Sequence, residues 1–492
     1  MNGAGDLILV LDAGTTSTRA MAFDPAGAVR AAAQHALTQH YPRPGWVEHD
    51  AAEIWRLTLA AAQAVVAEVG GAGRIAGIGI ANQRETVVAW DKASGEPLTR
   101  AIVWQDRRTM DFCAALRAQG AEPAVQEKTG LLLDPYFSAT KMRWMLDNVD
   151  AVAAAATAGR LAFGTVESWL TFKLTGGLHI SDAANASRTS LAPLVGQGWD
   201  EGLCDLFGAP RAALPEIVDN AGRFGASIAD LLGGAIPIAG LVGDQQAATI
   251  GQGCLSPGDT KATYGTGAFV LANMGAQAPR SRHRLLGTVL LQQGGARVYA
   301  LEGSVFVAGS LMQWLRDNLG MIAQSAETEA LARSTPDSGG VVVVPALAGL
   351  GAPHWRPDAR ASITGMTFAT TRAHIVRAAL EAMAMQTGDL AQAFAGDGAA
   401  WTSLRIDGGM SENDWMAQDL ADILDLPVER PAFVETTALG AAMLASVGAG
   451  LSPTLADAVT AMRGAVRTFT PAMTELVRRG RQDMWRAALA GV

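Results

Sequence analysis

The sequence predicts an α/β protein built from two domains that face one ligand cleft. Its 492 residues exceed what one hydrophobic core usually supports. An apolar run that breaks into a Gly-Thr turn and leaves again as an apolar run occurs twice, at residues 7–23 and 264–271. Between these hairpins stands Asp244, directly after the strand-like run 236–242. Two hairpins with a carboxylate between them predict two similar halves around one site.

The domain boundary is expected near the middle of the chain. The N-terminal domain, residues 1–252, holds the first hairpin and Asp244, and the C-terminal domain, residues 253–492, holds the second hairpin. Asp244 opens a helix after a strand, so its side chain is either a helix cap or a group that acts at a site. Its place between the two hairpins favours the second interpretation.

Composition excludes several classes of protein. The net charge of −9 supplies no basic excess for binding nucleic acid. No apolar run reaches the roughly 18–20 residues that a membrane span needs, so no membrane insertion is expected. The N-terminus lacks a basic and then apolar signal peptide, and the three cysteines show no metal-binding spacing. These features predict a protein of the reducing cytoplasm.

Two common nucleotide-binding motifs are absent from the sequence. None of the five lysines follows a glycine, so there is no G-x-x-x-x-G-K-S/T loop. Gly77 and Gly79 lie two apart in a strand-like run, but no third glycine follows and no helix begins there. A dinucleotide-binding fold is therefore rejected, and any use of ATP requires a different fold.

The first Gly-Thr turn has the composition of an anion-binding turn. Thr15, Thr16 and Ser17 offer short hydroxyl side chains on flexible backbone, with Asp12 before them and Arg19 after them. Backbone amides and hydroxyls that converge in such a turn can bind phosphate oxygens. A plain β-hairpin turn is the alternative, and the cluster of polar groups favours the phosphate interpretation.

A second group of residues suits a small polyol. Arg84 and Glu85 follow the apolar run 75–81, at the end of a strand where α/β proteins place ligand contacts. Arg donates hydrogen bonds and Glu accepts them, which suits vicinal hydroxyls, although a solvated charge pair has the same sequence. Trp104 and Tyr136 belong either to the core or to the wall of the same site.

The second half contains a further glycine-rich turn. A helix is expected over residues 305–319, with Gly309 and Gln313 on one face. Strand 404–407 leads into Gly408–Asn413, a turn that suits adenine or ribose lying against the backbone. The tail from residue 451 is expected to be helical.

Taken together and in this order, the motifs resemble the FGGY carbohydrate kinases of the hexokinase–actin superfamily, and within them the glycerol kinases. The resemblance covers about residues 6–490 and is carried by eleven blocks: Asp12–Arg19, Tyr41–Asp50, Asn82–Thr86, Ala101–Thr109, Asp134–Ser138, Gly243–Ala247, Tyr264–Gly267, Trp314–Asp317, Gly349–Pro353, Asp407–Gly409 and Glu435–Ala442. It implies two ribonuclease-H-like domains of the actin/hexokinase type with a ligand cleft between them. It also implies ATP-dependent phosphorylation of glycerol, magnesium, and a homo-oligomer, dimer or tetramer.

The resemblance also implies a role for each site residue. Asp244 is the expected general base, and Asp12 the residue that holds magnesium through water. The glycerol wall would comprise Arg84, Glu85, Trp104, Tyr136, Asp244, Gln245 and Phe269. The groups around ATP would comprise Thr15, Thr16, Ser17, Arg19, Thr266, Gly309, Gln313, Gly409 and Asn413.

Two alternatives stay open at this level. A kinase of the same family that acts on another small polyol or a ketose would share these motifs. A non-catalytic, actin-like nucleotide switch would share the fold, but it would not need Asp244 beside a polyol wall. The stretch Leu231–Pro237 lacks the arginine with which some bacterial relatives bind fructose 1,6-bisphosphate, which argues against that inhibition.

Overall fold

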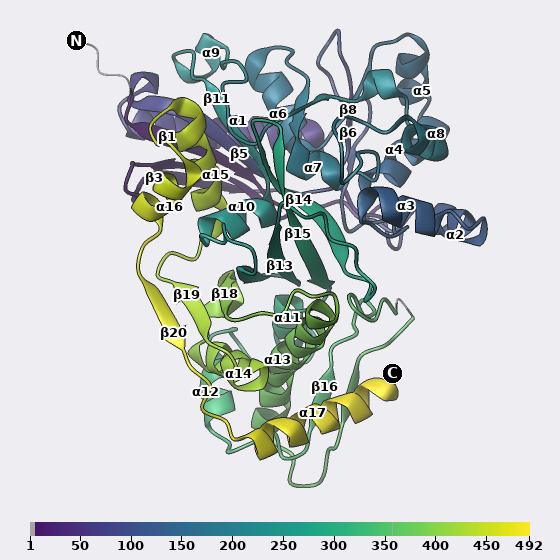
Figure 1. Cartoon of the computed structure of the whole chain (residues 1–492), viewed down its shortest axis with the longest axis vertical. Helices are drawn as coiled ribbons and strands as arrows, with labels where there is room; N and C mark the ends of the chain where they lie inside the picture. The colour runs from purple at the N-terminus through teal and green to yellow at the C-terminus, as the bar shows by residue number, and fades with distance from the viewer. Residues whose placement is uncertain (1–4, 357) are drawn as a thin grey trace.

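The computed structural model describes residues 5–356 and 358–492 and contains two large sheets. Figure 1 shows the first sheet in the upper half of the molecule and the second below it. This arrangement confirms the predicted α/β class with two sheet-containing halves. The expected boundary at residue 252 falls just after the helix α10 (Asp244–Gly251), and it stays a prediction.

The first sheet has the strand order β11-β5-β1-β2-β3. β1 pairs antiparallel with β2, β2 pairs antiparallel with β3, and β1, β5 and β11 run parallel. The predicted first hairpin is therefore confirmed as β1 and β2. The bounds of the five strands are Leu7–Ala13 (β1), Ser17–Phe23 (β2), Val29–Ala36 (β3), Ile75–Asn82 (β5) and Ile238–Gly243 (β11).

The second sheet repeats this order and adds a strand at each edge. Its order is β14-β15-β13-β12-β18-β19-β20. Three antiparallel strands, β15, β13 and β12, are followed by β18 and β19 in parallel, as in the first sheet. Their bounds are Thr260–Tyr264 (β12), Ala268–Gly275 (β13), Leu286–Gln293 (β14), Ala296–Val305 (β15), Leu404–Asp407 (β18), Val428–Pro431 (β19) and Val466–Phe469 (β20).

Strand β1 is buried on both faces, as its continuous apolar run predicts. Leu9 and Leu11 face a core that includes α1 and α6, whereas Ile8 and Val10 face a core that includes α10 and α15. Successive side chains of a strand point to opposite faces, so helices on both sides cover the sheet. These helices span Ala51–Glu68 (α1), Val166–Thr175 (α6), Thr436–Ala449 (α15) and Leu455–Met462 (α16).

Helix α15 comes from the second half of the chain but packs on the first sheet, as Figure 1 shows. Glycines make its close approach possible. A Cβ atom on Gly79 of β5 would lie 2.6 Å from the Ala441 carbonyl oxygen, and one on Gly440 would lie 1.9 Å from the Ala247 oxygen of α10. Gly79 therefore serves helix packing, consistent with rejection of a dinucleotide-binding motif at Gly77 and Gly79.

The first half also carries a helical region with its own core. Its helices are Met110–Ala118 (α2), Glu122–Thr129 (α3), Ser138–Asn148 (α4), Asp150–Thr157 (α5), Ala183–Ser187 (α7) and Glu201–Phe207 (α8), whereas Ala229–Leu232 (α9) packs with α1 on the core of the first sheet. Short strand pairs accompany them: Glu48–His49 (β4) with Ala101–Ile102 (β7), Val88–Asp91 (β6) with Leu161–Gly164 (β8), and Ile180–Asp182 (β9) with Glu216–Val218 (β10).

Helices of the second half cover its sheet. They span Gly309–Asp317 (α11), Glu327–Arg333 (α12), Arg372–Gly396 (α13), Asp414–Leu424 (α14) and Glu475–Ala490 (α17), with a pair of strands at Val342–Val344 (β16) and Ser362–Thr364 (β17). Short 3₁₀ turns occur at Ala72–Arg74, Arg211–Ala213 and Gly409–Glu412. Over residues 5–356 and 358–492, no helix combines the length and apolar character that crossing a bilayer requires.

Two expectations about the second half are wrong. Residues 305–308 do not begin a helix, because β15 continues to Val305 and α11 starts at Gly309. The tail from residue 451 is not entirely helical, because β20 pairs antiparallel with β19 and extends the sheet. Both errors arise where the apolar residues of a strand run directly into those of a helix, or where a short edge strand has an exposed surface.

We predict that Gly440→Ala lowers the free energy of unfolding by roughly 3 kcal/mol, because overpacking a rigid crossing forces backbone shifts. Thermal unfolding followed by circular dichroism measures this change. Gly480→Ala is the matched control, since this glycine lies in α17 with open space around its Cβ position. The control should be neutral or stabilising, and equal midpoints for both variants would contradict the close packing of α15.

Candidate functional site

Two cavities adjoin each other where the two sheets meet. A small cavity of about 150 Å³ lies against the ends of β5 and β11, and a larger cavity of about 530 Å³ lies in the second half. Gly265 and Thr266 line both cavities. The turn of the second hairpin, between β12 and β13, therefore lies at the boundary between the two cavities.

The small cavity brings together all seven residues predicted to bind a polyol. Its lining residues include Thr15, Arg84, Glu85, Trp104, Tyr136, Asp244, Gln245, Thr266 and Phe269. These residues are far apart in the sequence, since Thr15 and Phe269 are separated by 254 positions, and the fold brings them together. Three further residues complete the lining, Thr263, Gly265 and Gly267, and the sequence analysis predicted no role for them.

Asp244 stands at the end of β11, where α10 begins. Its side chain is 27% exposed and lies on the wall of the small cavity. Its Oδ1 accepts a hydrogen bond of 2.7 Å from the Gln245 backbone N–H. Burial of this region raises the pKa of Asp244 to about 6, while the Arg84 guanidinium lowers it and Glu85 raises it. Such a carboxylate is ionised at neutral pH and still has an increased affinity for a proton.

Three aromatic rings form another side of the small cavity. The Trp104 ring meets Tyr136 at a centroid distance of 5.6 Å and Phe269 at 5.9 Å, both edge to face. The Trp104 indole Nε1 donates to Thr15 Oγ1 at 2.9 Å, which joins the aromatic wall to the first hairpin. Rings fixed in this way offer an apolar surface to the carbon side of a small ligand.

The charged wall depends on two residues that the sequence analysis missed. Glu302 of β15 binds both terminal nitrogens of Arg84, at 2.6 and 3.0 Å. Arg188 donates from Nε to Glu85 at 2.7 Å and from Nη2 to Glu302 at 3.1 Å. All four side chains are at most 2% exposed.

In the network of Arg84, Glu85, Arg188 and Glu302, opposite charges favour the ionised forms of Arg84, Arg188 and Glu302. Burial raises the pKa of Glu302, but the guanidinium groups of Arg188 and Arg84 lower it to about 2. The pKa of Arg84 lies above its usual value, because Glu302 and Glu85 outweigh burial. Glu85 has a φ of 59°, a left-handed conformation that is uncommon for a residue with a side chain. Local strain of this kind concentrates at functional sites.

Gln245 is also held from behind by a residue that the sequence did not indicate. The fully buried ammonium of Lys261 donates to Gln245 Oε1 at 2.7 Å and to Thr263 Oγ1 at 2.6 Å. Burial lowers the pKa of Lys261, and Asp407 opposes this effect. Thr263 donates in turn to Asp407, which directly precedes the glycine turn of the larger cavity.

The residues of the first hairpin that were predicted to bind phosphate lie in different surroundings. Thr15 lines the small cavity, Thr16 is exposed at the turn, and the Ser17 hydroxyl accepts a hydrogen bond from Gln34. Arg19 pairs with Asp12 at 3.3 Å and with Glu435 at 2.5 Å. Burial raises the pKa of Asp12 to about 6, Arg19 lowers it, and Asp244 raises it further.

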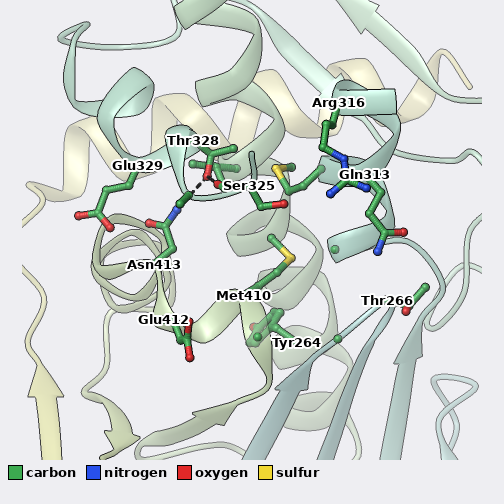
Figure 2. Close-up of a pocket in the computed structure, with 16 residues that line it drawn as sticks. Tyr264, Thr266, Gln313, Arg316, Ser325, Thr328, Glu329, Met410, Glu412 and Asn413 are labelled. Atoms are coloured by element: carbon green, nitrogen blue, oxygen red, sulfur yellow. Dashed lines mark hydrogen bonds between the residues drawn. The ribbon is translucent and has the colours of Figure 1, made fainter. Parts of the chain in front are cut away.

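The larger cavity contains the predicted nucleotide residues Gly309, Gln313, Gly409 and Asn413, together with Thr266. Figure 2 shows Asn413 and Thr328 on one side of it and Gln313 with Arg316 on the other. A Cβ atom on Gly309 would lie 2.6 Å from the Gly265 oxygen, so only glycine fits there. The Asn413 side chain caps α14 and donates to Thr328 at 3.2 Å. Gly409 has no atom within 4 Å of its Cβ position.

Comparison with known families identifies both halves of the chain. Residues 7–251 match the N-terminal domain of the FGGY family of carbohydrate kinases, and residues 260–449 match its C-terminal domain. Among curated proteins, glycerol kinase of Rhodospirillum centenum is 53% identical over 489 residues, covering 99% of this chain and 98% of that protein. Glycerol kinase of Methylobacterium nodulans is 52% identical, covering 98% and 97%.

Solved structures show the same architecture. The structure of Plasmodium falciparum glycerol kinase with ADP superimposes with a TM-score of 0.92 at 35% identity, covering 99% of this chain and 98% of that one. Xylulose kinase from Rhodospirillum rubrum superimposes with a TM-score of 0.86 at 27% identity, covering 98% of each chain. On its sequence and its structure, the chain belongs to the FGGY family of carbohydrate kinases.

Proposed function

We propose that this protein phosphorylates glycerol to sn-glycerol 3-phosphate with ATP. The observation that carries the proposal is the small cavity of about 150 Å³, with Asp244 on its wall and Thr266 shared with the larger cavity. A cavity of about this volume holds benzene, a molecule of six heavy atoms. Glycerol also has six heavy atoms, whereas a pentulose has ten. The relatives named glycerol kinase support the same substrate.

The walls of the small cavity suit the two sides of glycerol. Arg84 donates and Glu85 accepts hydrogen bonds, so this pair can bind two neighbouring hydroxyl groups. Gln245 adds a further polar group, oriented by Lys261. Trp104 and Phe269 supply the apolar surface for the carbon chain. Tyr136 closes the cavity, and its hydroxyl lies 3.4 Å from Arg84 Nη2.

Asp244 is proposed as the general base. It would accept the proton of the terminal hydroxyl while that oxygen attacks the γ-phosphorus of ATP. A base within hydrogen-bond reach typically contributes about 10²–10⁴-fold to the rate. The position of Asp244 between the polyol wall and Thr266, which also lines the larger cavity, supports this role.

The larger cavity is proposed as the ATP site. Its volume of about 530 Å³ lies within the range of roughly 300–1,000 Å³ that is typical of ligand pockets. Gly309, Gln313, Gly409 and Asn413 would hold the nucleoside. Phosphate oxygens would meet the two hairpin turns, where Thr15, Thr16, Ser17, Arg19 and Thr266 supply hydroxyl, amide and guanidinium donors.

Magnesium is proposed at Asp12. Residues 5–356 and 358–492 contain no cluster of three or more His, Cys, Asp or Glu residues able to hold a metal. Mg²⁺ usually needs only one or two carboxylates, because water and phosphates supply the other ligands. Burial raises the pKa of Asp12, and Asp244 raises it further, so a cation beside Asp12 would favour its ionised form. When bound, the ion would neutralise charge on the phosphates.

We propose that the protein works in the cytoplasm. Cys113, Cys204 and Cys254 are free and buried, which suits a reducing cytoplasm. A dimer or tetramer, as the family resemblance implies, stays a prediction.

The direct test is a coupled assay of purified protein with ATP, Mg²⁺ and a panel of polyols. We expect kcat/KM for glycerol to exceed that for erythritol and for a pentulose by at least about tenfold, because larger molecules do not fit the small cavity. A pentulose turned over faster than glycerol would contradict the proposed substrate and leave the family unaffected. ATP hydrolysis that does not depend on any polyol would favour a nucleotide switch.

Asp244→Asn should reduce kcat by at least about 100-fold, because an amide cannot accept the hydroxyl proton. Binding of ATP, measured by isothermal titration calorimetry, should remain close to that of the unchanged protein, since Asp244 does not line the larger cavity. Retention of most of the turnover would remove the general-base role from Asp244.

Gly409→Val should raise KM for ATP by about tenfold and leave KM for glycerol unchanged. The added side chain has no protein neighbour within 4 Å and occupies space that lines the larger cavity. Gly464→Val is the matched control, since its Cβ position is also open and it lines neither cavity. Equal KM values for ATP in both variants would argue against a nucleotide at Gly409.

A further inference from the structure

Glu302 is placed to act on the polyol site from the opposite half of the molecule. It lies in β15 of the second sheet, paired in register with Leu271 of β13. Its side chain is fully buried and does not line either cavity. Its two ion-pair partners, Arg84 and Arg188, come from the first half of the chain, and the Ser304 hydroxyl of its own strand also donates to it. Glu302 therefore cannot touch the substrate, and any effect on catalysis must pass through these arginines.

The contacts of Arg84 indicate which carboxylate it would bind if Glu302 were removed. Glu302 binds Nη1 and Nη2 as a bidentate pair, which fixes both the position and the plane of the guanidinium. Arg84 Nε forms the ion pair with Asp244, at 3.4 Å from Oδ1. Glu85 is farther from Arg84 Nε, at 3.9 Å, and is already bound by Arg188 at 2.7 Å. If Glu302 lost its charge, Asp244 would be the nearest carboxylate available to Arg84.

We propose that Glu302 is a positioning residue for catalysis: its bidentate ion pair with Arg84 occupies both terminal nitrogens, so that Arg84 meets Asp244 through Nε at 3.4 Å and does not form a second bidentate pair with this carboxylate, which stays available to the substrate hydroxyl. A tight Arg84–Asp244 pair would compete with the hydroxyl for the same oxygen atoms. It would also make Asp244 a weaker base, because a neighbouring cation stabilises the ionised form.

The charges around Asp244 support a local balance. Arg84 and Lys261 act on it as cations and Glu85 acts on it as a carboxylate, while Asp244 itself raises the pKa of Asp12. Arg84 and Glu85 also belong to the buried network with Arg188 and Glu302, in which two positive and two negative charges balance. A buried ion network of this kind is weak evidence for stability, since desolvation offsets much of its attraction. Orientation of the groups that contact the substrate is the better explanation.

The inference rests on the proposed role of Asp244, and a double-mutant cycle tests it in the full-length protein. Glu302→Gln should lower kcat by at least about tenfold with KM for ATP unchanged, using the polyol that the unchanged protein phosphorylates best. In the Asp244→Asn background, the same substitution should cost less than about twofold, because its target is gone. Failure of the proposed substrate appears separately, as absence of glycerol turnover by the unchanged protein.

Glu381→Gln is the matched control, because Glu381 is also a buried carboxylate between two arginines, Arg377 and Arg481, within the second half. It should keep kcat. Glu302→Asp keeps the charge, and its kcat should fall between those of the unchanged protein and Glu302→Gln. If Glu302→Gln does not fold, Glu302→Asp replaces it in the same double-mutant cycle. Unchanged kcat in the Glu302 variant, or an equal loss in the Asp244→Asn background, would overturn the proposal.

Discussion

The ion pair between Arg84 and Glu302 constrains the site more than any other single contact. Each side chain is buried, and each comes from a different half of the molecule. A buried charge without a partner is very unfavourable, so the pair fixes how the two halves meet at this point. Two sides of the small cavity depend on this junction. Glu85 is held by Arg188, which also binds Glu302, and Phe269 lies on β13, which pairs with the strand that carries Glu302. The shape of the small cavity and the positions of its charged side chains therefore depend on this contact.

The repeated sheet order explains why the reactive groups converge. In each sheet a strand of the hairpin runs parallel to its neighbour, β1 to β5 and β12 to β18, so the carboxyl ends of each pair lie at the same edge. Asp12 lies near the end of β1 at that edge of the first sheet, and Asp407 ends β18 at that edge of the second. Helix α15 returns to the first sheet and donates from Thr436 to Asp407 at 2.6 Å. The chain thus passes through the junction of the two halves several times, and the cavities form at these passages.

The sequence predicted those parts of the site that are encoded locally. The two hairpins, the strand before Asp244 and the turn at Gly408 each have a recognisable pattern of apolar and glycine residues. Glu302 and Arg188 have none, because their partners lie 218 and 103 residues away in the sequence. Arg188 stands in a polar stretch that reads as a loop, although the fold buries it completely. Burial that is created only by tertiary packing leaves no periodic signal near the residue itself.

The state of Asp244 follows from opposing effects of similar kind. Burial raises its pKa, and the Arg84 guanidinium lowers it, as does the hydrogen bond from the Gln245 backbone N–H. If burial alone acted, the group would bind a proton too tightly to be free at neutral pH. If Arg84 acted with its whole charge, the carboxylate would be a weak base already engaged by a cation. Glu302 takes up the terminal nitrogens of Arg84. Together, burial and the charges around it give Asp244 a pKa of about 6, so the carboxylate is ionised at neutral pH and more basic than a free aspartate. A base with these properties can exchange a proton with a hydroxyl without staying protonated at neutral pH.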